Sequence, residues 1–284
     1  MNHRPKLGVM MFATGTTMPL PRLAARVEAL GFESLFLPEH PVIPERFDSP
    51  YPGGGPLPDE YRMMVDPYVG LAAAAGATRR IRLGTSISLI LERRPLLAAK
   101  AIATLDRVSH GRVVLGIGSG WLREEGDVFN VDWERRGAQM REFVAAMKTC
   151  WTDEVSSFDG RYVRFPEVIV EPKPVQRPHP PILIAGELGL AAKRAAAWGN
   201  GWMPRYLWST PEMVEDGRRR MEAGWRERGR DPATIDITLF GCRRDRDEIA
   251  RWADAGVTRI LFVLPMEDEA STASRLDRIA ERVM

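Results

Sequence analysis

The chain has 284 residues, a length that α/β barrels commonly reach as a single domain. Its 40 basic and 38 acidic side chains leave a net charge of +2, which gives no electrostatic argument for binding nucleic acid or a membrane surface. The two cysteines, Cys150 and Cys242, lack metal-ligand spacing, so we expect reduced thiols and no metal site.

The chain begins with MNHRPKLGVMMFATG, in which the apolar run is only a few residues long. This run is too short for a secretory signal peptide. No later segment approaches the roughly 18 consecutive apolar residues that a membrane helix needs. We therefore expect a cytoplasmic protein without a membrane anchor.

Short apolar runs then alternate with longer amphipathic segments to the end of the chain. The predicted strands cover residues 7–11, 34–37, 81–86, 113–117, 182–184, 201–203, 235–240 and 259–263. The predicted helices cover residues 21–30, 67–78, 95–109, 135–151, 188–198, 211–228, 245–255 and 269–283. Alternating strands and helices indicate a parallel sheet, and eight repeats favour a closed (β/α)8 TIM barrel over an open sheet.

Two segments depart from this repeat. Residues 41–66 carry six prolines and the run Gly53-Gly54-Gly55, and loops of this length are often lids. A flexible excursion without a role is an equally good interpretation of that segment. Residues 152–181 contain Asp159-Gly160, a turn signal that predicts a hairpin. No linker divides the chain, so we expect one domain over residues 1–284 with these two insertions.

The third and fourth predicted strands end in small residues, in Gly84-Thr85-Ser86-Ile87 and in Gly116-Ile117-Gly118-Ser119-Gly120. Such residues let the backbone approach a ligand closely. The second run fails the Gly-x-Gly-x-x-Gly dinucleotide fingerprint, because Trp121 or Arg123 stands where the third glycine belongs. A methyltransferase motif is disfavoured, since no acidic residue precedes the glycines. A strand end whose N–H groups face a phosphate, or a plain tight turn, remains.

His40 follows the second predicted strand, at the edge of a barrel where catalytic residues gather. A histidine there can exchange a proton near neutral pH, although a hydrogen-bonded surface histidine is the alternative. The neighbouring Glu39 either binds a polar ligand edge or is solvated. After the fifth strand, small residues lead into a helix from about Leu188, whose free N–H groups suit an anion.

Three segments resemble the bacterial luciferase-like flavin and deazaflavin oxidoreductases, most closely the coenzyme F420-dependent branch. They are GFESLFLPEH, the run from DPYVGLAAAAG to GIGSGWLREE, and PKPVQRPHPPILIAGELGLAAKRAAAWGNGWMP. The resemblance covers residues from about 7 to 205 and is most specific across 66–125. It implies a (β/α)8 barrel, a flavin-type cofactor at the C-terminal face, a small organic substrate and a homodimer.

The resemblance also assigns roles to individual residues. His40 is the expected catalytic residue, and Glu39 stands where the family often has Asp. Ser86-Ile87 corresponds to a bulge with a non-proline cis peptide behind the cofactor ring. The remaining expected cofactor-binding residues are Gly118, Ser119, Gly120 and Trp121 along the ribityl and phosphate side, and Ala185, Gly186, Glu187 and Leu188, whose N–H groups hold the phosphate.

The resemblance predicts hydride transfer between the C5 position of F420 and an organic substrate, with His40 handling the accompanying proton. Arg93 and Arg94 either neutralise the acidic tail of F420 or are solvated. An FMN-dependent two-component monooxygenase is the alternative, and a non-catalytic flavin-binding barrel is a second one. Some sugar-phosphate-oxidising relatives have Glu where Trp121 stands, so the resemblance does not assign their substrate to this chain.

Overall fold

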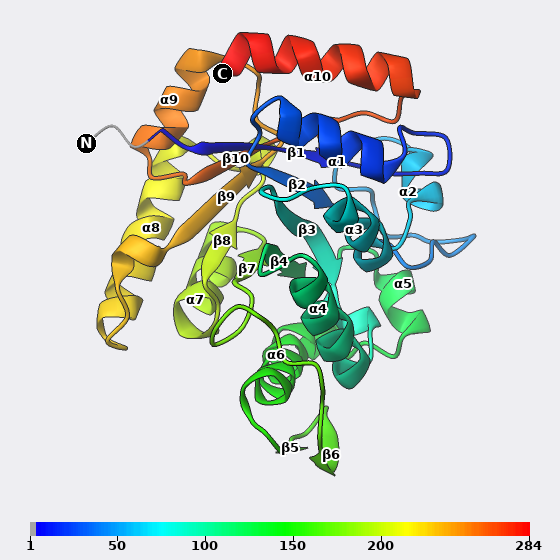
Figure 1. The fold of residues 1–284 in the computed structure, drawn as a ribbon. Coiled ribbons are helices and arrows are strands. Elements are labelled where there is room, and N and C mark those ends of the chain that lie inside the picture. Colours follow the sequence, from blue (N-terminus) through cyan, green and yellow to red (C-terminus); the bar gives the residue numbers. More distant parts are fainter. Residues whose placement is uncertain (1–3) are drawn as a thin grey trace.

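The computed structural model describes residues 4–284, in which eight parallel strands close into a barrel with helices around it (Figure 1). The predicted TIM barrel is therefore confirmed. Around the barrel the strands follow the order β1-β10-β9-β8-β7-β4-β3-β2. Their bounds are Lys6–Met11 (β1), Ser34–Leu37 (β2), Arg82–Leu89 (β3), Val113–Gly118 (β4), Ile182–Ala185 (β7), Gly201–Met203 (β8), Asp236–Phe240 (β9) and Arg259–Leu264 (β10).

Eight long helices cover the outside of the barrel, and each begins and ends within two residues of its predicted bounds. They are Leu20–Ala29 (α1), Pro67–Gly76 (α3), Pro95–Val108 (α4), Arg136–Thr152 (α6), Leu188–Trp198 (α7), Pro211–Arg226 (α8), Arg246–Asp254 (α9) and Glu269–Val283 (α10). Proline in the first turn helps to start four of them, since its missing N–H has no partner there in any helix. Within residues 4–284, no helix is long and apolar enough to cross a membrane.

The sequence pattern did not predict several short elements of the structure. The helices Glu60–Met63 (α2) and Arg123–Val128 (α5) are too short to show a helical period, as are the 3-10 turns Ile90–Glu92 (η1), Trp133–Arg135 (η2), Tyr206–Trp208 (η3) and Pro232–Thr234 (η4). The predicted hairpin is confirmed, with Ser156–Asp159 (β5) antiparallel to Arg164–Val168 (β6) at the bottom of Figure 1. β3 was predicted to end at Ser86, but it continues to Leu89.

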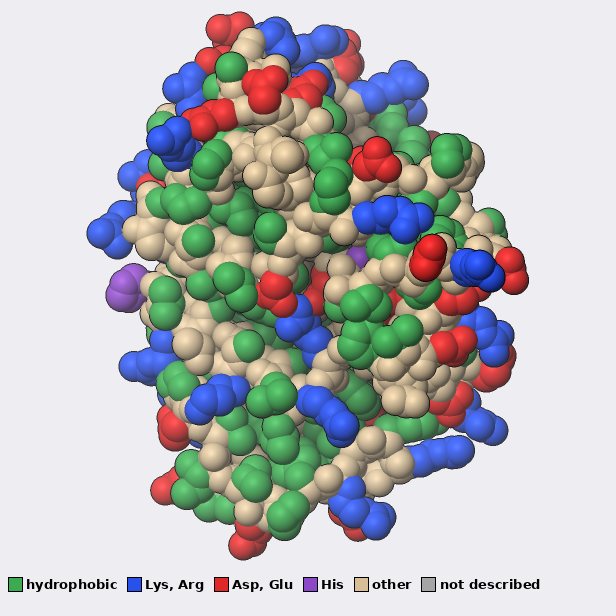
Figure 2. All heavy atoms as spheres, turned by 90° about the vertical axis from the view of Figure 1, so that its right-hand side faces the viewer, with side chains coloured by type: hydrophobic (Ala, Val, Ile, Leu, Met, Phe, Trp, Pro, Cys, Tyr) green, Lys and Arg blue, Asp and Glu red, His purple; other side chains and the backbone are tan. Residues whose placement is uncertain are grey.

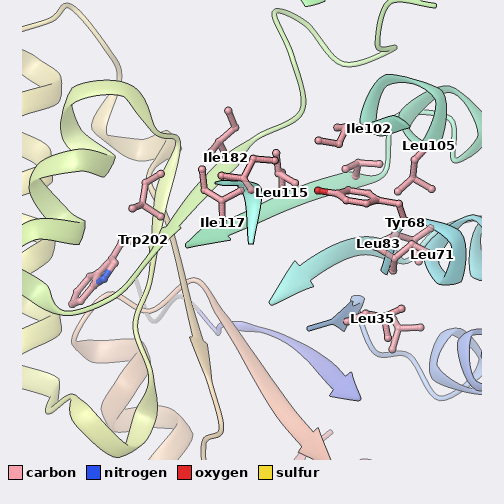
Figure 3. Close-up of a cluster of buried hydrophobic side chains, with 14 of the residues drawn as sticks. Leu35, Tyr68, Leu71, Leu83, Ile102, Leu105, Leu115, Ile117, Ile182 and Trp202 are labelled. Carbon is pink, nitrogen blue, oxygen red and sulfur yellow. The ribbon is translucent and has the colours of Figure 1, made fainter. Parts of the chain in front are cut away.

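The barrel core has two layers, because successive side chains of a strand point to opposite faces. Phe36, Val114 and Leu261 point into the barrel, where they pack with Met10, Leu183 and Met203. The outward layer packs against the helices, as Figure 3 shows for Leu35, Leu83 and Leu115 beside Leu71, Ile102 and Leu105. Burying each such side chain contributes about 1.5–3 kcal/mol, so both faces of every strand must be apolar.

Gly84 shows how tightly the interior is filled. A Cβ atom at this position would lie 2.2 Å from the ring of Phe36, on the neighbouring strand β2. The ring therefore occupies the space that any larger residue on β3 would need. The small residues of this strand serve core packing at its centre, before β3 reaches the cavity described below.

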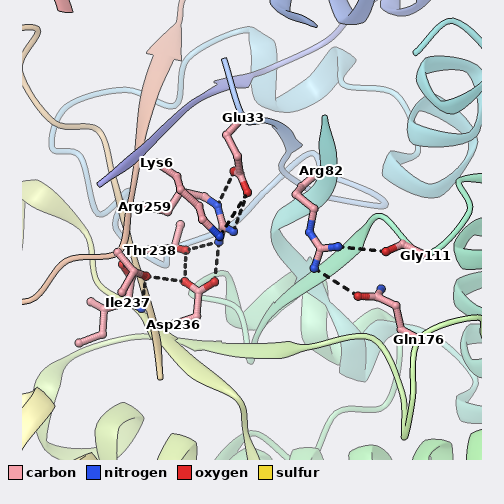
Figure 4. Close-up of polar contacts among 10 residues, drawn as sticks. Lys6, Glu33, Arg82, Gly111, Gln176, Asp236, Ile237, Thr238 and Arg259 are labelled. Atoms are coloured by element: carbon pink, nitrogen blue, oxygen red, sulfur yellow. Dashed lines mark hydrogen bonds and ion pairs between the residues drawn. The ribbon is translucent and has the colours of Figure 1, made fainter. Parts of the chain in front are cut away.

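An ion-pair cluster lies at the opposite end of the barrel, where the strands begin (Figure 4). Arg259, only 2% exposed at the start of β10, donates from Nε to Glu33 over 2.8 Å and from Nη1 to Asp236 over 2.7 Å. Burial alone would lower the pKa of Arg259, but Asp236 and Glu33 outweigh it and raise that pKa. The guanidinium thus joins the starts of β2, β9 and β10 electrostatically.

We expect Arg259→Ala to lower the free energy of unfolding by about 3–5 kcal/mol, because it leaves two partly buried carboxylates without their cation. Urea denaturation measures this change. Arg22→Ala is the matched control, since Arg22 pairs with Glu269 on the exposed surface and such pairs contribute less than about 1 kcal/mol. Equal losses in the two variants would show that the cluster adds no more than a surface pair.

Candidate functional site

A cavity of about 530 Å³ opens at the C-terminal ends of the barrel strands. All eight strand ends contribute to it, together with the segment between β2 and α3. Figure 2 views the molecule from the side on which that segment projects in Figure 1, and this face is hollowed near its centre. Eleven of the twelve residues predicted for the site line the cavity, all except Leu188. The volume lies in the range typical of small-molecule and cofactor sites.

The end of β3 forms one wall. The peptide bond Ser86-Ile87 is cis, and the register between β3 and β4 shifts between Thr85 and Ser88, so the predicted bulge is present. Ile87 enters the cavity wall beside Gly118, where an added Cβ would lie only 2.1 Å from the Ile87 Cδ1 atom. Ser86 is 5% exposed, and its Oγ atom has no hydrogen-bond partner. This wall therefore offers an apolar shelf beside an unsatisfied hydroxyl group.

Glu39 is held firmly by its own chain. Its carboxylate accepts hydrogen bonds from the Ser88 hydroxyl over 2.6 Å, from the Leu89 N–H over 2.9 Å and from the Arg93 guanidinium. Arg93 also pairs with Asp66. Burial lowers the pKa of Arg93, but Glu39 outweighs that effect and raises it. Because Arg93 is committed to two carboxylates, it is not a free cation for an acidic ligand tail.

His40 is enclosed rather than solvated, with a side chain only 6% exposed. Its Nδ1 atom lies 2.5 Å from Oε2 of Glu125, and the indole N–H of Trp121 points to its Nε2 atom over 3.3 Å. The Tyr61 ring lies 5.3 Å from the imidazole, centre to centre. The alternative of a surface histidine on a mobile loop does not match this environment, which holds the ring in one orientation at the cavity wall.

Sequence reasoning missed two acidic residues beside His40. Glu125 is fully buried on the short helix α5, and its Oε1 atom accepts the N–H of Val42 over 3.3 Å. Glu92 is 8% exposed in η1, and burial, then Glu125 and Glu39, raise its pKa to about 9. The only sequence signal for Glu125 was the adjacent pair Glu124-Glu125, six and seven residues after the end of β4, which is too weak to separate a buried acid from a solvated one.

The opposite end of the cavity lies at the start of α7. Ala185, Gly186 and Glu187 line it, and the backbone at Gly186 has φ of 123°, a value that favours glycine. Glu187 precedes the helix without capping it through its side chain, so the first N–H groups of α7 stay available to an anion. The side chain of Leu188 packs toward Gly217 on α8, which leaves only its backbone N–H for the predicted role.

Segment 41–66 forms the rim and lines part of the cavity with Tyr51 and Tyr61. The Tyr51 ring lies 5.3 Å from that of Tyr61 and 5.8 Å from that of Trp121, centre to centre. The N–H groups of Asp48 and Ser49 donate to Glu124 over 2.9 and 3.1 Å, which ties the segment to α5. The segment is thus part of the site wall, and a lid motion stays a prediction.

A second cavity, of about 620 Å³, adjoins the first at Gly241 and Val263. It is lined mostly by charged side chains of the loop after β9 and contains none of the predicted site residues. Arg244 donates to the Val263 carbonyl over 2.8 Å, and Arg282 pairs with Asp245 over 3.7 Å. These internal contacts give the second cavity no feature that points to a ligand.

Arg93 and Arg94 offer a direct test of the Glu39 network. We expect Arg93→Ala to lower the free energy of unfolding by about 3 kcal/mol, because it leaves the buried carboxylate of Glu39 without its cation. Arg94→Ala is the matched control, since Arg94 is exposed and makes no side-chain hydrogen bond or ion pair to any residue in 4–284. Its effect should stay within about 0.5 kcal/mol. Thermal or urea unfolding that fails to separate the two variants would contradict the network's importance.

Comparison with known proteins adds to this geometry. A family model described as luciferase-like monooxygenase matches residues 6–282. An uncharacterised protein of Mycobacterium tuberculosis is 36% identical over 284 residues, which cover 97% of this chain and 98% of the relative. An F420-dependent glucose-6-phosphate dehydrogenase of Amycolatopsis mediterranei is 27% identical over 275 residues, 92% of this chain and 75% of the relative. An FMNH2-dependent dimethylsulfone monooxygenase of Pseudomonas putida is 32% identical over 167 residues, which cover 55% of this chain and 43% of the relative.

Two solved structures share the fold. A monooxygenase from Streptomyces bottropensis superposes with a TM-score of 0.76 at 24% identity, covering 98% of both chains. An F420-dependent secondary alcohol dehydrogenase, solved with an F420–acetone adduct, superposes with a TM-score of 0.74 at 18% identity, covering 99% of this chain and 98% of its own. At these identities the likeness concerns the fold alone.

Proposed function

The chain belongs to the luciferase-like monooxygenase family, and from this premise we propose that it is an F420-dependent oxidoreductase. It would transfer a hydride between the deazaflavin C5 position and a small organic substrate. The observation that carries the proposal is the meeting of three features in one cavity. They are the Ser86-Ile87 bulge, the uncapped start of α7 and the enclosed His40.

The residues of the cavity fit a ring cofactor with a phosphate. The side chain of Ile87 packs against Gly118 and gives the cavity an apolar wall on which a ring could lie. The unpartnered hydroxyl of Ser86 is available to a polar ring edge, since a buried polar atom gains stability from a partner. The backbone N–H groups at the start of α7 would hold the phosphate. Each of these contacts would depend on the shape of the cofactor and not on its redox chemistry.

A bound deazaflavin would supply a carbon that gives or accepts the hydride, while the protein positions the reactants. His40 would take up the proton that an oxidised alcohol releases, or return it in the reverse direction, at its Nε2 atom. The aromatic side chains of Phe12, Tyr61 and Trp121 would exclude water from this face. Phe12, Trp121 and Arg205 are our candidates for contacting the substrate, because all three line the cavity.

An FMN-dependent two-component monooxygenase is the second candidate. The relative from Pseudomonas putida favours it, since that protein is named as FMNH2-dependent and matches 55% of this chain. The α7 phosphate site would serve either cofactor equally. A non-catalytic flavin-binding barrel is a weaker alternative, because a solely binding protein has no need for an enclosed histidine with a buried carboxylate partner.

We also propose a single domain over residues 1–284, a homodimer and a cytoplasmic location. The family model spans residues 6–282, which supports one continuous domain with the two insertions inside it. The dimer and the location rest on resemblance to the family and on the composition of the chain. The expected partner of the site is a small organic molecule, with no role for nucleic acid or a membrane.

Titration of the cofactor-free protein with F420 and, separately, with FMN tests the cofactor assignment. We expect F420 to bind at micromolar concentration or below and FMN to bind more weakly, with cofactor fluorescence as the measurement. Tighter binding of FMN would favour the monooxygenase. If neither bound at micromolar concentration, the proposed function would fall.

His40→Gln tests the proton role in the F420-loaded protein. We expect turnover to drop by about 10²- to 10⁴-fold, the usual contribution of a general acid or base, while F420 affinity is unchanged. The assay follows the cofactor's visible absorbance with secondary alcohols and sugar phosphates, the substrate classes named for the F420-dependent relatives. Full turnover in a variant that still binds F420 would remove His40 from the mechanism.

A further inference from the structure

We propose that Glu125 and Glu92 form a buried carboxyl pair that fixes the tautomer of His40. In this arrangement Glu125 is a carboxylate that accepts the Nδ1–H of His40, and Glu92 is the protonated, neutral member of the pair. The Nε2 atom of His40 is then left as the proton acceptor of the site. This assignment rests on the proposed function for its catalytic meaning, but its geometry concerns only the chain itself.

The hydrogen bonds around His40 decide which ring nitrogen carries the proton. An indole N–H can only donate, so the Trp121 Nε1 atom, 3.3 Å from Nε2 of His40, requires Nε2 to be an acceptor. A neutral imidazole then carries its proton on Nδ1. That proton points at Oε2 of Glu125, 2.5 Å away, which accepts it. The two neighbours therefore select the same tautomer independently.

The surroundings of Glu125 suit it to accept this hydrogen bond from His40. Its side chain is only 1% exposed, so water does not compete for the hydrogen bond. One oxygen lies 2.5 Å from Nδ1 of His40 and the other accepts the Val42 N–H over 3.3 Å, so both oxygens are held in place as acceptors. Glu125 does not itself line the cavity, so it is a positioning residue that acts through His40.

Glu92 lies against this carboxylate and lacks a cation of its own. Glu125, Glu39 and Arg93 are the charged groups that influence it, and Arg93 is already bonded to Glu39 and Asp66. The Oε2 atom of Glu92 is buried without a partner. Two adjacent buried carboxyl groups do not both ionise, and Glu92 is the one without a compensating donor. The raised pKa of Glu92, about 9, agrees with this assignment.

The pair makes the proton transfer at His40 local and reversible. For Nε2 to take a proton from a substrate hydroxyl, its long contact with the Trp121 N–H, 3.3 Å, must first open. The ring then becomes an imidazolium that keeps its Nδ1–H on Glu125. The new positive charge is balanced by that carboxylate, so no second proton has to move. In the reverse direction Nε2 returns its proton and the ring regains its starting tautomer. Glu92 keeps its proton throughout.

Nitrogen-15 NMR of the cofactor-free protein with labelled histidine tests the tautomer without any turnover. The chain has only four histidines, and the signal lost in His40→Gln identifies His40. We expect His40 at pH 7.5 to be protonated on Nδ1 and bare at Nε2. A proton on Nε2 of His40 in the wild-type protein would overturn the proposal, and the variant serves only to assign the signal.

Two isosteric variants then test the division of roles. Glu125→Gln should weaken the preference for the Nδ1–H tautomer, which then rests on the Trp121 contact alone, and lower turnover with F420 by about 10²- to 10⁴-fold, as expected when a histidine loses its orienting carboxylate. Glu92→Gln should keep the Nδ1–H tautomer, because an amide N–H can replace the protonated carboxyl as donor. The opposite pattern, with Gln tolerated at position 125 and disruptive at position 92, would reverse the two assignments and contradict the proposal.

The pH dependence of stability tests the proton on Glu92. Its pKa is about 9 in the folded protein and near the ordinary 4.5 when unfolded, so its contribution is full below pH 4.5 and is lost as pH rises toward 9. The Tm of Glu92→Gln should therefore gain on the wild-type Tm between pH 5 and pH 8.5. A Tm difference that does not change with pH would show that Glu92 is ionised.

These outcomes separate the pair from the cofactor assignment. If F420 fails to bind while NMR finds the Nδ1–H tautomer, the positioning pair stands and the proposed function does not. If F420 supports turnover while His40 carries its proton on Nε2, the function stands and the pair is wrong. Glu124→Gln is the matched control for the NMR measurement, since Glu124 neighbours Glu125 in sequence but contacts the rim segment instead of His40.

Discussion

Pairing of β1 with β10 closes the sheet, and the site depends on that closure. Six residue pairs join the two strands, from Lys6 and Arg259 to Met11 and Leu264. Because all eight strands are parallel, closure gathers their C-terminal ends into one rim, although they are spread over most of the chain. The apolar shelf on β3, His40 after β2 and the uncapped start of α7 become neighbours only through this constraint.

The two ends of the barrel handle buried charge differently. At the start of the strands, the carboxylates of Glu33 and Asp236 share the guanidinium of Arg259, and Glu33 also pairs with Lys6 over 3.9 Å, so two cations face two carboxylates. At the other end, Glu39, Glu92 and Glu125 outnumber the one nearby guanidinium, that of Arg93. The first arrangement satisfies every charge and serves stability. The second leaves a surplus carboxyl group, which is where pKa values shift and where functional chemistry is commonly found.

Sequence patterns predicted what local chemistry determines, and missed what contacts between distant segments determine. Helix and strand periods gave the barrel, and the small residues of RLGTSIS and GIGSG marked two walls of the cavity. By contrast, Glu125 meets His40 across 85 positions of sequence, and Tyr51 lies within a proline-rich loop. The end of β3 was predicted three residues early because the ladder with β4 resumes after the bulge, which no alternation of side chains reveals.

For a related reason, the lining of the cavity does not identify one particular cofactor. The groups suited to hold a ring and a phosphate are backbone atoms and small residues, namely the bulge, Gly118 and the first turn of α7. Flavins and deazaflavins share those parts, so these contacts do not separate them. Discrimination falls to the side chains above the shelf, where His40 and Trp121 meet the rim tyrosines. Substitutions on that face, rather than in the phosphate end, are therefore where selection between hydride transfer and oxygen chemistry would act.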